Sequence, residues 1–395
     1  MTNQFVLRVA SAMILIGTLS AGLWPFHVPK NAVRWLEEGG LGFGRHGSVL
    51  SSKTFQSTNL AERASCSLEI WLEPAAIQKS GTILTFYKPE SFVVLLALRQ
   101  SLSDLEIGRG DPDHPQHLRY NRVYADDVFR EPGPVLITIT SGPSGTTVYS
   151  NTIIVKHSSR LKFSARDFAG QLILGNAPST TDSWSGKLIG LAIYLRELPI
   201  DRIKQHYRNW MDHRLTPEQD AVALYPFNED MGSVAHNLVD PTTGLVIPDS
   251  FVVPNKPFLE RPWDEFYPGW SYWQNLAVNI FGFVPLGFSF CVLFYTSQRV
   301  RRPVLLTIAL GFAVSLTIEV LQGFLPTRDS GMTDLFTNTF GTGLGAFAFM
   351  KVSALWHGAG GATIECPPES AQSRPSRVPR GTRGTRGHSS LPDNC

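Results

Sequence analysis

Two pairs of polar residues interrupt apolar runs near the end of the chain. Glu319 and Gln322 are three residues apart, and Asp334 and Asn338 are four apart, so the members of each pair share one face of a helix. An ionisable group inside a membrane helix costs roughly 2.5–3.5 kcal/mol and usually faces the interior of a helix bundle or a water-filled cavity. We therefore expect these four side chains to meet at one polar site.

Two further residues belong to the same candidate binding site. Asn279 lies near the start of an earlier apolar run, and Arg328 lies in the loop between the two pairs. A guanidinium group matches the fork of a carboxylate or a phosphate, so Arg328 is the expected partner of Glu319 or Asp334, or of an anionic ligand. The predicted polar cluster consists of Asn279, Glu319, Gln322, Arg328, Asp334 and Asn338.

The apolar runs that carry these residues are long enough to cross a bilayer. They cover residues 5–26, 275–296, 304–325 and 332–356. Proline and glycine are frequent in them, as in many membrane helices. The first run could instead be a cleaved signal peptide, because Leu19-Ser20-Ala21-Gly22 offers a weak cleavage site. We expect it to be retained as the first transmembrane helix.

Positive charges between and after the spans predict their orientation. Arg299, Arg301 and Arg302 lie between the second and third spans, and the tail after the fourth is rich in arginine. Such segments remain in the cytoplasm. We therefore expect a multi-pass protein of the cell (inner) membrane with both termini in the cytoplasm and residues 27–270 outside it. The polar cluster would then lie at the outer leaflet.

The middle of the chain reads as a β domain. Short runs that alternate or are continuously apolar are separated by turn residues, which is typical of an antiparallel sandwich. The expected strands are residues 66–74, 81–87, 91–100, 133–140, 145–155, 170–176 and 185–198, followed by a helix over 199–211. Cys66 is the only cysteine in this region, so no disulfide is expected inside it.

Four stretches of this domain resemble the laminin-G-like, concanavalin-A-like jelly-roll family. They are "LEIWLEP", "GTTVYSN", "LILGNAPSTTDSWSGKLIGLAIYLRELPIDRIKQHY" and "ALYPFNEDMGSVAHN". The resemblance implies a two-sheet sandwich that binds a glycan or a protein, sometimes with a calcium site, for which Asp126 and Asp127 are candidates. A solvated turn at these two acids, and a spacer domain without any ligand, remain alternatives.

The apolar spans resemble the VanZ-like family. The resemblance rests on "NLAVNIFGFVPLGF" (residues 275–288) and on "IEVLQGFLPTRDSGMTDLFTNTFGTGLG" (residues 318–345), which contain all six residues of the polar cluster. It implies a bacterial envelope protein with a link to resistance against the glycopeptide teicoplanin, and it names no reaction. The sequence departs from the family in its first loop, which is usually short and here carries the sandwich.

The expected fold class is multidomain: an all-β jelly-roll sandwich inserted into a four-helix transmembrane VanZ-like bundle. The expected parts are the first transmembrane helix (1–26), a linker (27–47), the sandwich (48–258), an aromatic interfacial segment (259–274), transmembrane helices two to four (275–356) and a disordered basic tail (357–395).

Two classes of function remain open at this point. We expect a non-catalytic protein whose sandwich binds a glycan or an envelope protein and whose polar cluster recognises an amphiphilic or lipid-linked molecule. The alternative is a membrane enzyme that acts on a lipid-linked saccharide with Glu319 as acid or base. The expected partners are membrane lipids and no nucleic acid. No cofactor and no metal is expected, and the oligomeric state is left open.

Overall fold

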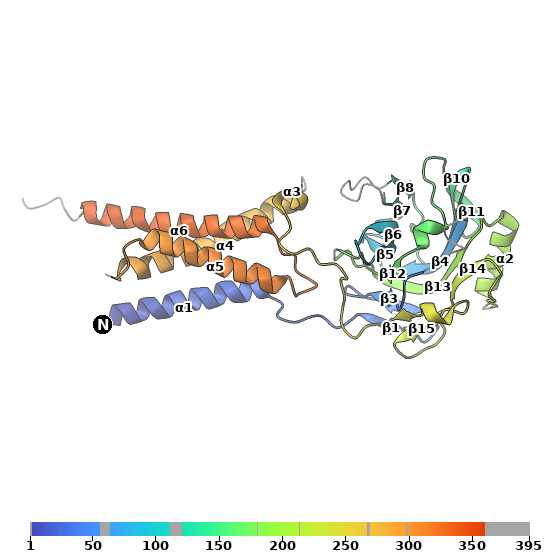
Figure 1. Cartoon of the computed structure of the whole chain (residues 1–395), viewed down its shortest axis with the longest axis horizontal. Coiled ribbons are helices and arrows are strands. Elements are labelled where there is room, and N and C mark those ends of the chain that lie inside the picture. The colour runs from blue at the N-terminus through green and yellow to red at the C-terminus, as the bar shows by residue number, and fades with distance from the viewer. Residues whose placement is uncertain are drawn as a thin grey trace, which may run out of the picture. The chain divides into compact units, whose positions relative to one another are not determined.

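The computed structural model describes residues 2–55, 64–110, 121–179, 181–212, 214–266, 269–297 and 299–359. Between residues 33 and 246 the described chain forms two antiparallel sheets, which stack face to face (Figure 1). This confirms the predicted β-sandwich.

The first sheet has the strand order β1-β2-β13-β4-β9-β10-β11, with β14 also paired to β13. Its strands are β1 (Val33–Trp35), β2 (Leu41–Phe43), β4 (Cys66–Pro74), β9 (Val135–Gly142), β10 (Gly145–Ser150), β11 (Ile153–Ser158), β13 (Gly186–Tyr194) and β14 (Ala221–Tyr225). The central strands alternate between two buried faces. Leu68 and Ile70 of β4 enter the core between the sheets, whereas Trp71 enters a second core on the outer face.

The second sheet has the order β15-β16-β3-β12-β5-β6-β7-β8. Its strands are β3 (Val49–Ser51), β5 (Gly81–Tyr87), β6 (Val94–Ser101), β7 (Asp104–Arg109), β8 (Asn121–Ala125), β12 (Gln171–Leu174), β15 (Val234–Ala235) and β16 (Leu245–Val246). The 3-10 helices η1 (Ala165–Phe168) and η2 (Pro241–Thr243) lie in the connections before β12 and β16. Cys66 is a free, buried thiol, and burial raises its pKa well above the usual range.

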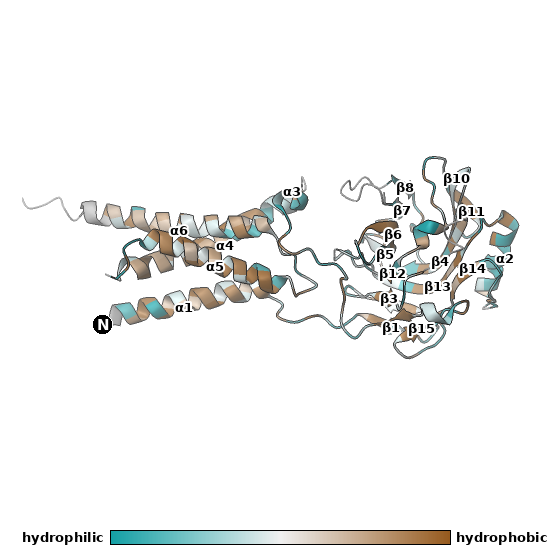
Figure 2. Cartoon of the chain, viewed as in Figure 1, coloured by the Kyte–Doolittle hydropathy of each residue, from teal (hydrophilic) through white to brown (hydrophobic). Residues whose placement is uncertain are grey.

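Helix α2 (Ile200–Met211) covers the outer face of the first sheet and was predicted within one residue. Ile203 and Trp210 pack from this helix against the sheet. Figure 2 shows the polar outer side of α2 and the hydrophobic strands beneath it. This second core explains why most residues of β4 and β13 are buried on both faces of the sheet.

Residues 33–43 correct the predicted boundaries of the sandwich. They were assigned to a linker over 27–47, but β2 pairs with β13 and β1 pairs with β2. Leu41 is fully buried and Phe43 is almost so. Each strand is only three residues long, which is too short for the alternation of apolar and polar residues to be recognised. The polar strands β7 and β8 were missed, and the predicted strand over 145–155 is a hairpin of β10 and β11.

The helical region contains α1 (Thr2–Leu23), α3 (Pro262–Glu265), α4 (Trp270–Tyr295), α5 (Pro303–Gln322) and α6 (Met332–Ala359). Helix α4 begins inside the segment that was predicted to be interfacial. Helices α4 and α6 approach closely, since a Cβ added to Gly341 would lie 2.1 Å from the carbonyl oxygen of Ile280, and one added to Gly345 would lie 2.1 Å from that of Val284. These small residues allow the backbone contact that the Gly-x-x-x-Gly spacing predicts.

Three of these helices are long and apolar enough to cross a membrane: residues 4–23 of α1, α4 and α5. The fourth predicted span, α6, is not among them, because Asn338, Lys351 and several threonines and glycines reduce its hydropathy. Figure 2 shows the difference between a strongly hydrophobic α5 and a paler α6. Of the predicted tail, only residues 357–359 fall in the described part of the chain, where they end α6.

Candidate polar cavity and a second buried network

All six residues of the predicted polar cluster line one cavity of about 380 Å³. Helices α1, α4, α5 and α6 and the loop between α5 and α6 form its wall. The cavity is lined from α1 and α4 by Thr18, Ala21, Gly22, Asn275, Val278, Asn279, Gly282 and Phe283. From α5, α6 and the loop between them it is lined by Ile318, Glu319, Gln322, Arg328, Asp329, Asp334 and Asn338. The helical spacing that paired these residues in the sequence is therefore matched by their position in the structure.

The two acids are held in place by donors from neighbouring segments. Glu319 is 1% exposed, and its Oε2 accepts a hydrogen bond from the backbone N–H of Gly331, at 2.9 Å. Asp334 lies in the first turn of α6, where its Oδ1 accepts a hydrogen bond from Asn279 Nδ2 at 2.6 Å. Each carboxylate thus has one oxygen engaged, and both face the same cavity.

The two amides each leave an oxygen without a partner. Gln322 Nε2 donates to the backbone carbonyl of Gly22 at 2.7 Å, and Asn338 Nδ2 donates to Ser315 Oγ at 3.0 Å. The oxygens Gln322 Oε1 and Asn338 Oδ1 are buried and accept no hydrogen bond from the described residues. Such buried oxygens are costly unless a donor reaches them. The cavity is therefore rich in free acceptors.

Arg328 lies at this cavity but does not make the ion pair that its sequence position predicted. Its Nε donates to the backbone carbonyl of Trp24 at 2.8 Å. Among the described residues, no ion pair joins its guanidinium to Glu319 or Asp334. The carbonyl after α1 fixes the side chain, and the remaining N–H groups are left for another acceptor. The loop geometry that allows this cannot be read from spacing.

Lys256 and Glu265 were missed by the sequence analysis. Lys256 Nζ donates to the carbonyls of Gln322, at 2.6 Å, and Leu325, so it caps the end of α5. Burial lowers the pKa of Lys256 to about 8, and the nearby charge of Arg328 adds to this effect. The only signal in the sequence is that this lysine stands between prolines in an otherwise uncharged stretch, "VVPNKPFL".

Glu265 lies against the start of α6. A Cβ added to Gly331 would come within 1.9 Å of Glu265 Oε1, so only glycine allows the carboxylate to approach this closely. Burial raises the pKa of Glu265, and Asp329 adds to the effect. The beginning of α6 is thus surrounded by the carboxylates of Glu265, Glu319 and Asp334, which the positive end of the helix dipole favours.

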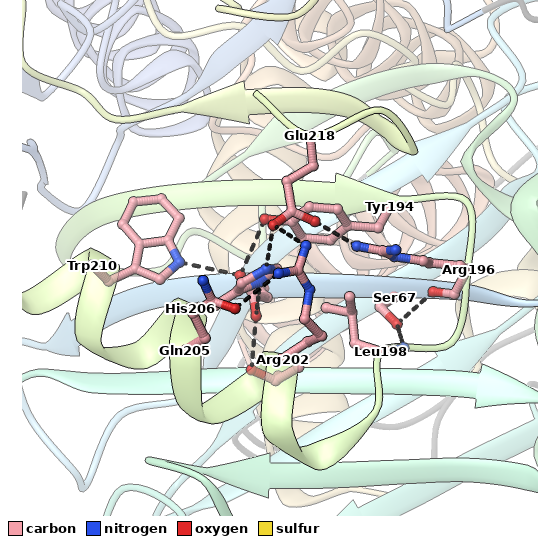
Figure 3. A network of polar contacts seen from close by, with 11 residues as sticks. Ser67, Tyr194, Arg196, Leu198, Arg202, Gln205, His206, Trp210 and Glu218 are labelled. Carbon is pink, nitrogen blue, oxygen red and sulfur yellow. Dashed lines mark hydrogen bonds and ion pairs between the residues drawn. The ribbon is translucent and has the colours of Figure 1, made fainter. Parts of the chain in front are cut away.

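A second polar network lies under α2 in the sandwich (Figure 3). Glu69 of β4 is fully buried on the outer face of the first sheet. Its Oε1 lies 3.1 Å from His206 Nδ1, and its Oε2 accepts a hydrogen bond from Trp210 Nε1 at 3.1 Å. His206 Nε2 lies 3.0 Å from Glu218 Oε1. The histidine is therefore held between two carboxylates.

The charges of this network favour a protonated histidine. Burial alone would lower the pKa of His206, but the hydrogen bonds and charges of Glu69 and Glu218 outweigh it and raise the pKa. Glu218 also pairs with Arg196 and Arg202. Burial would raise the pKa of Glu218, yet His206 and the two arginines lower it. The imidazole and both carboxylates are bound within the fold, and only Arg196 Nε lacks a partner among the described residues, so we interpret the network as the attachment of α2 to the sheet.

A cavity of about 310 Å³ opens beside this network. Its wall includes the rings of Trp71 and Trp210, which meet edge to face at 6.1 Å, and the acids Glu37, Glu38 and Asp230. Aromatic walls with a few polar groups are usual in pockets for small ligands. The sequence analysis did not find this pocket, because its residues come from five separate segments.

The candidate calcium ligands form ion pairs at the surface. Asp126 Oδ2 lies 3.2 Å from Lys156 Nζ, and Asp127 Oδ2 lies 3.3 Å from Arg130 NH1. In the described part of the chain, no three histidine, cysteine or acidic side chains come together as metal ligands. The local geometry therefore favours the solvated turn over the calcium site.

The VanZ/LLP1 family model matches residues 200–356, which include α2 and the helices α3, α4 and α5 and most of α6. The chain carries a VanZ-like domain. Together with its three apolar helices, this domain makes the chain a membrane protein. None of the curated proteins matches the chain.

Several solved structures are similar to parts of this chain. A putative carbohydrate-binding protein from Bacteroides ovatus is 13% identical, with 58% of this chain and 63% of that one covered and a TM-score of 0.37. A structure from a study of botulinum neurotoxin type C and two ganglioside molecules is 14% identical, with 46% and 45% covered and a TM-score of 0.34. A sialidase carbohydrate-binding module from Ruminococcus gnavus, bound to sialyllactose, is 10% identical, with 36% and 83% covered and a TM-score of 0.31.

Proposed function

We propose that this protein is a non-catalytic, multi-pass protein of the bacterial inner membrane that holds the polar head of an amphiphilic or lipid-linked molecule in its helical cavity. The observation that supports this most directly is that Asn279, Glu319, Gln322, Arg328, Asp334 and Asn338 line one cavity. Polar side chains in membrane helices are costly, so a shared cavity is the arrangement expected of a binding site.

In this proposal all four long helices span the membrane, and the sandwich is inserted after the first of them, outside the cytoplasm. The arginines at 299, 301 and 302 support a cytoplasmic loop between α4 and α5, which places the α5–α6 loop on the opposite side. The ends of α1 and α5 that meet at Gly22 and Gln322 are then at the outer leaflet.

The sandwich would bind a glycan or an envelope protein outside the membrane. The pocket that Trp71 and Trp210 border supports the glycan, since it combines apolar edges with the acids Glu37 and Glu38, which can accept hydrogen bonds from sugar hydroxyls. We propose no reaction at this pocket.

Arg328 provides the test of the helical site. In Arg328→Ala the N–H groups at the cavity are lost, and we expect the purified full chain to retain several-fold less phosphorus-containing lipid than the wild type, roughly tenfold for a charged hydrogen bond. Arg328→Lys should recover part of the retention, because an ammonium group lacks the planar fork. Bound phosphorus per mole of protein, measured after extensive detergent washing, gives the comparison.

The control is Arg261→Ala, which removes an exposed arginine that does not line the cavity. Unchanged retention in Arg328→Ala, at normal levels of inserted protein, would show that the cluster is a structural network and not a head-group site.

A further inference from the structure

Apart from the N–H groups of Arg328, the buried side-chain atoms without a partner among the described residues that line the helical cavity are two acceptors, Gln322 Oε1 and Asn338 Oδ1. Gln322 is the most clearly determined of them. The carbonyl of Gly22 can only accept, so the Nε2 end of Gln322 must face it, and Oε1 must point away. This side chain is 7% exposed, its Oε1 has no partner among the described residues, and it lines the cavity. A missing donor is therefore expected next to Gln322 Oε1.

The charges of the cavity wall point the same way. Glu319, Asp329 and Asp334 contribute carboxylates, and Arg328 contributes the single guanidinium. Carboxylates that are removed from water need a cation or strong donors. An ammonium group provides both, because it carries three N–H donors and a positive charge. A sugar hydroxyl provides a donor without the charge.

The apolar end of a ligand has a route into the bilayer. Ala21 of α1 and Val278 of α4 line the cavity and are exposed on the outside of the helices, and Val278 is 69% exposed. An acyl or prenyl chain attached to a head group in the cavity would thus meet apolar residues of α1 and α4 at the cavity edge.

We infer that the molecule held in this cavity carries a primary ammonium group next to a phosphate. The ammonium would be held by Glu319, Asp334 and Gln322 Oε1, and the phosphate would contact Arg328. This inference rests on the proposed function and narrows its ligand class. Two sources share this chemistry, namely a phospholipid with an ethanolamine head and a prenyl phosphate that carries an unacetylated amino sugar.

Gly282 allows the cavity to be blocked without disturbing the fold. It lines the cavity, and a Cβ added to it would meet no atom within 4 Å. Gly282→Leu therefore fills the cavity with a side chain. Gly17 in α1 is the matched control, because it also has open space around an added Cβ but does not line the cavity.

The experiment uses the purified full chain in mixed micelles with equal amounts of phosphatidylethanolamine, phosphatidylcholine and phosphatidylglycerol. Bound lipids are identified by mass spectrometry. We expect phosphatidylethanolamine to be enriched roughly tenfold over phosphatidylcholine, which has the same phosphate but no N–H donor. The enrichment should persist in Gly17→Leu, disappear in Gly282→Leu and fall in Glu319→Gln, which keeps an acceptor for the Gly331 N–H but loses the charge. In a second arm, a prenyl phosphate that carries an unacetylated amino sugar competes with phosphatidylethanolamine for the purified chain. The compound that displaces the other identifies which of the two sources the cavity prefers.

Phosphatidylglycerol or phosphatidylcholine could be retained as well as phosphatidylethanolamine, with all retention lost in Gly282→Leu. That result would contradict the inference that the ligand carries an ammonium group, and it would leave the proposed head-group site standing. If each lipid is retained equally by Gly282→Leu and Gly17→Leu, the ammonium inference and the proposed head-group site are both wrong.

Discussion

At the scale of single residues, His206 shows how the sandwich fixes a charge in its interior. The imidazole touches Glu69 on one side and Glu218 on the other, and the ring of Tyr194 lies 5.1 Å away. A buried ion pair adds stability only when its hydrogen bonds are complete, and removing one partner leaves the other charge unpaired. The same residue types that could serve in acid–base catalysis are used here to attach a helix.

The pKa of His206 predicts how this attachment depends on pH. Because the folded-state pKa is raised above 6.5, the histidine stabilises the fold fully below pH 6.5, and this contribution is lost as the pH rises through the raised value. The lowered pKa of Glu218 acts in the opposite sense, and its contribution is present above pH 4.5 and lost as the pH falls further. The attachment of α2 should thus be strongest between pH 4.5 and pH 6.5.

Hydrogen exchange of α2, corrected for the intrinsic effect of pH on the exchange rate, measures this attachment. We expect protection to decrease from pH 6 to pH 9 in the wild type and to be low and nearly independent of pH in His206→Gln. His157→Gln is the control, since His157 is exposed and its Nδ1 lies 2.9 Å from Thr147 Oγ1 in the hairpin of β10 and β11. Equal pH dependence in all three proteins would exclude His206 as the titrating group.

At the scale of elements, strongly periodic segments were predictable and short ones were not. The helix over 199–211 and three of the four predicted apolar spans were found because their patterns extend over several turns. Strands β1 and β2 escaped because three residues cannot establish a period, and the pairing of β2 with β13 is a contact across more than 140 positions of the chain. The cluster at Glu319 and Gln322 was predictable from helical spacing, whereas Lys256 lies in an irregular segment and Glu265 in the four-residue helix α3, which are both too short to show a period.

Strands β1 and β2 predict how stable the sandwich is when it is expressed as a separate fragment. A fragment of residues 28–258 should melt cooperatively, whereas a fragment of residues 48–258 should lose about 3–6 kcal/mol through the missing burial of Leu41 and Phe43 alone. The shorter fragment also lacks Asn31, whose side chain bonds to the carbonyls of Ser48 and Pro248, both at 2.8 Å. Thermal unfolding followed by circular dichroism compares the two. Identical melting curves would mean that residues 28–47 contribute nothing to the fold.

At the scale of the whole molecule, the chain has two separate kinds of interior. The sandwich has an apolar core between its sheets, whereas the helical region has a small apolar core around Phe283, Leu286, Val314 and Ile318 and a polar cavity at one end. Most of the acidic and amide side chains of α4, α5 and α6 thus gather at this cavity, whereas buried hydroxyl groups such as those of Ser11 and Thr307 lie elsewhere along the helices. That arrangement gives one end of the helical region a polar cavity and leaves the rest mainly apolar.

The central claim is that this cavity is polar, hydrated and open from outside the cell, and thiol labelling tests it most directly. Cys66 and Cys291 are buried, so a chain with Cys366→Ser and Cys395→Ser has little background. Thr18→Cys places a thiol at the cavity, and Leu321→Cys places one next to Gln322 but outside the lining, on an exposed position of α5. We predict that a membrane-impermeant maleimide labels Thr18→Cys in intact cells and leaves Leu321→Cys unlabelled, because a thiol in lipid does not ionise. Labelling of Thr18→Cys only after the cells are permeabilised, or equal labelling of both positions, would contradict the claim.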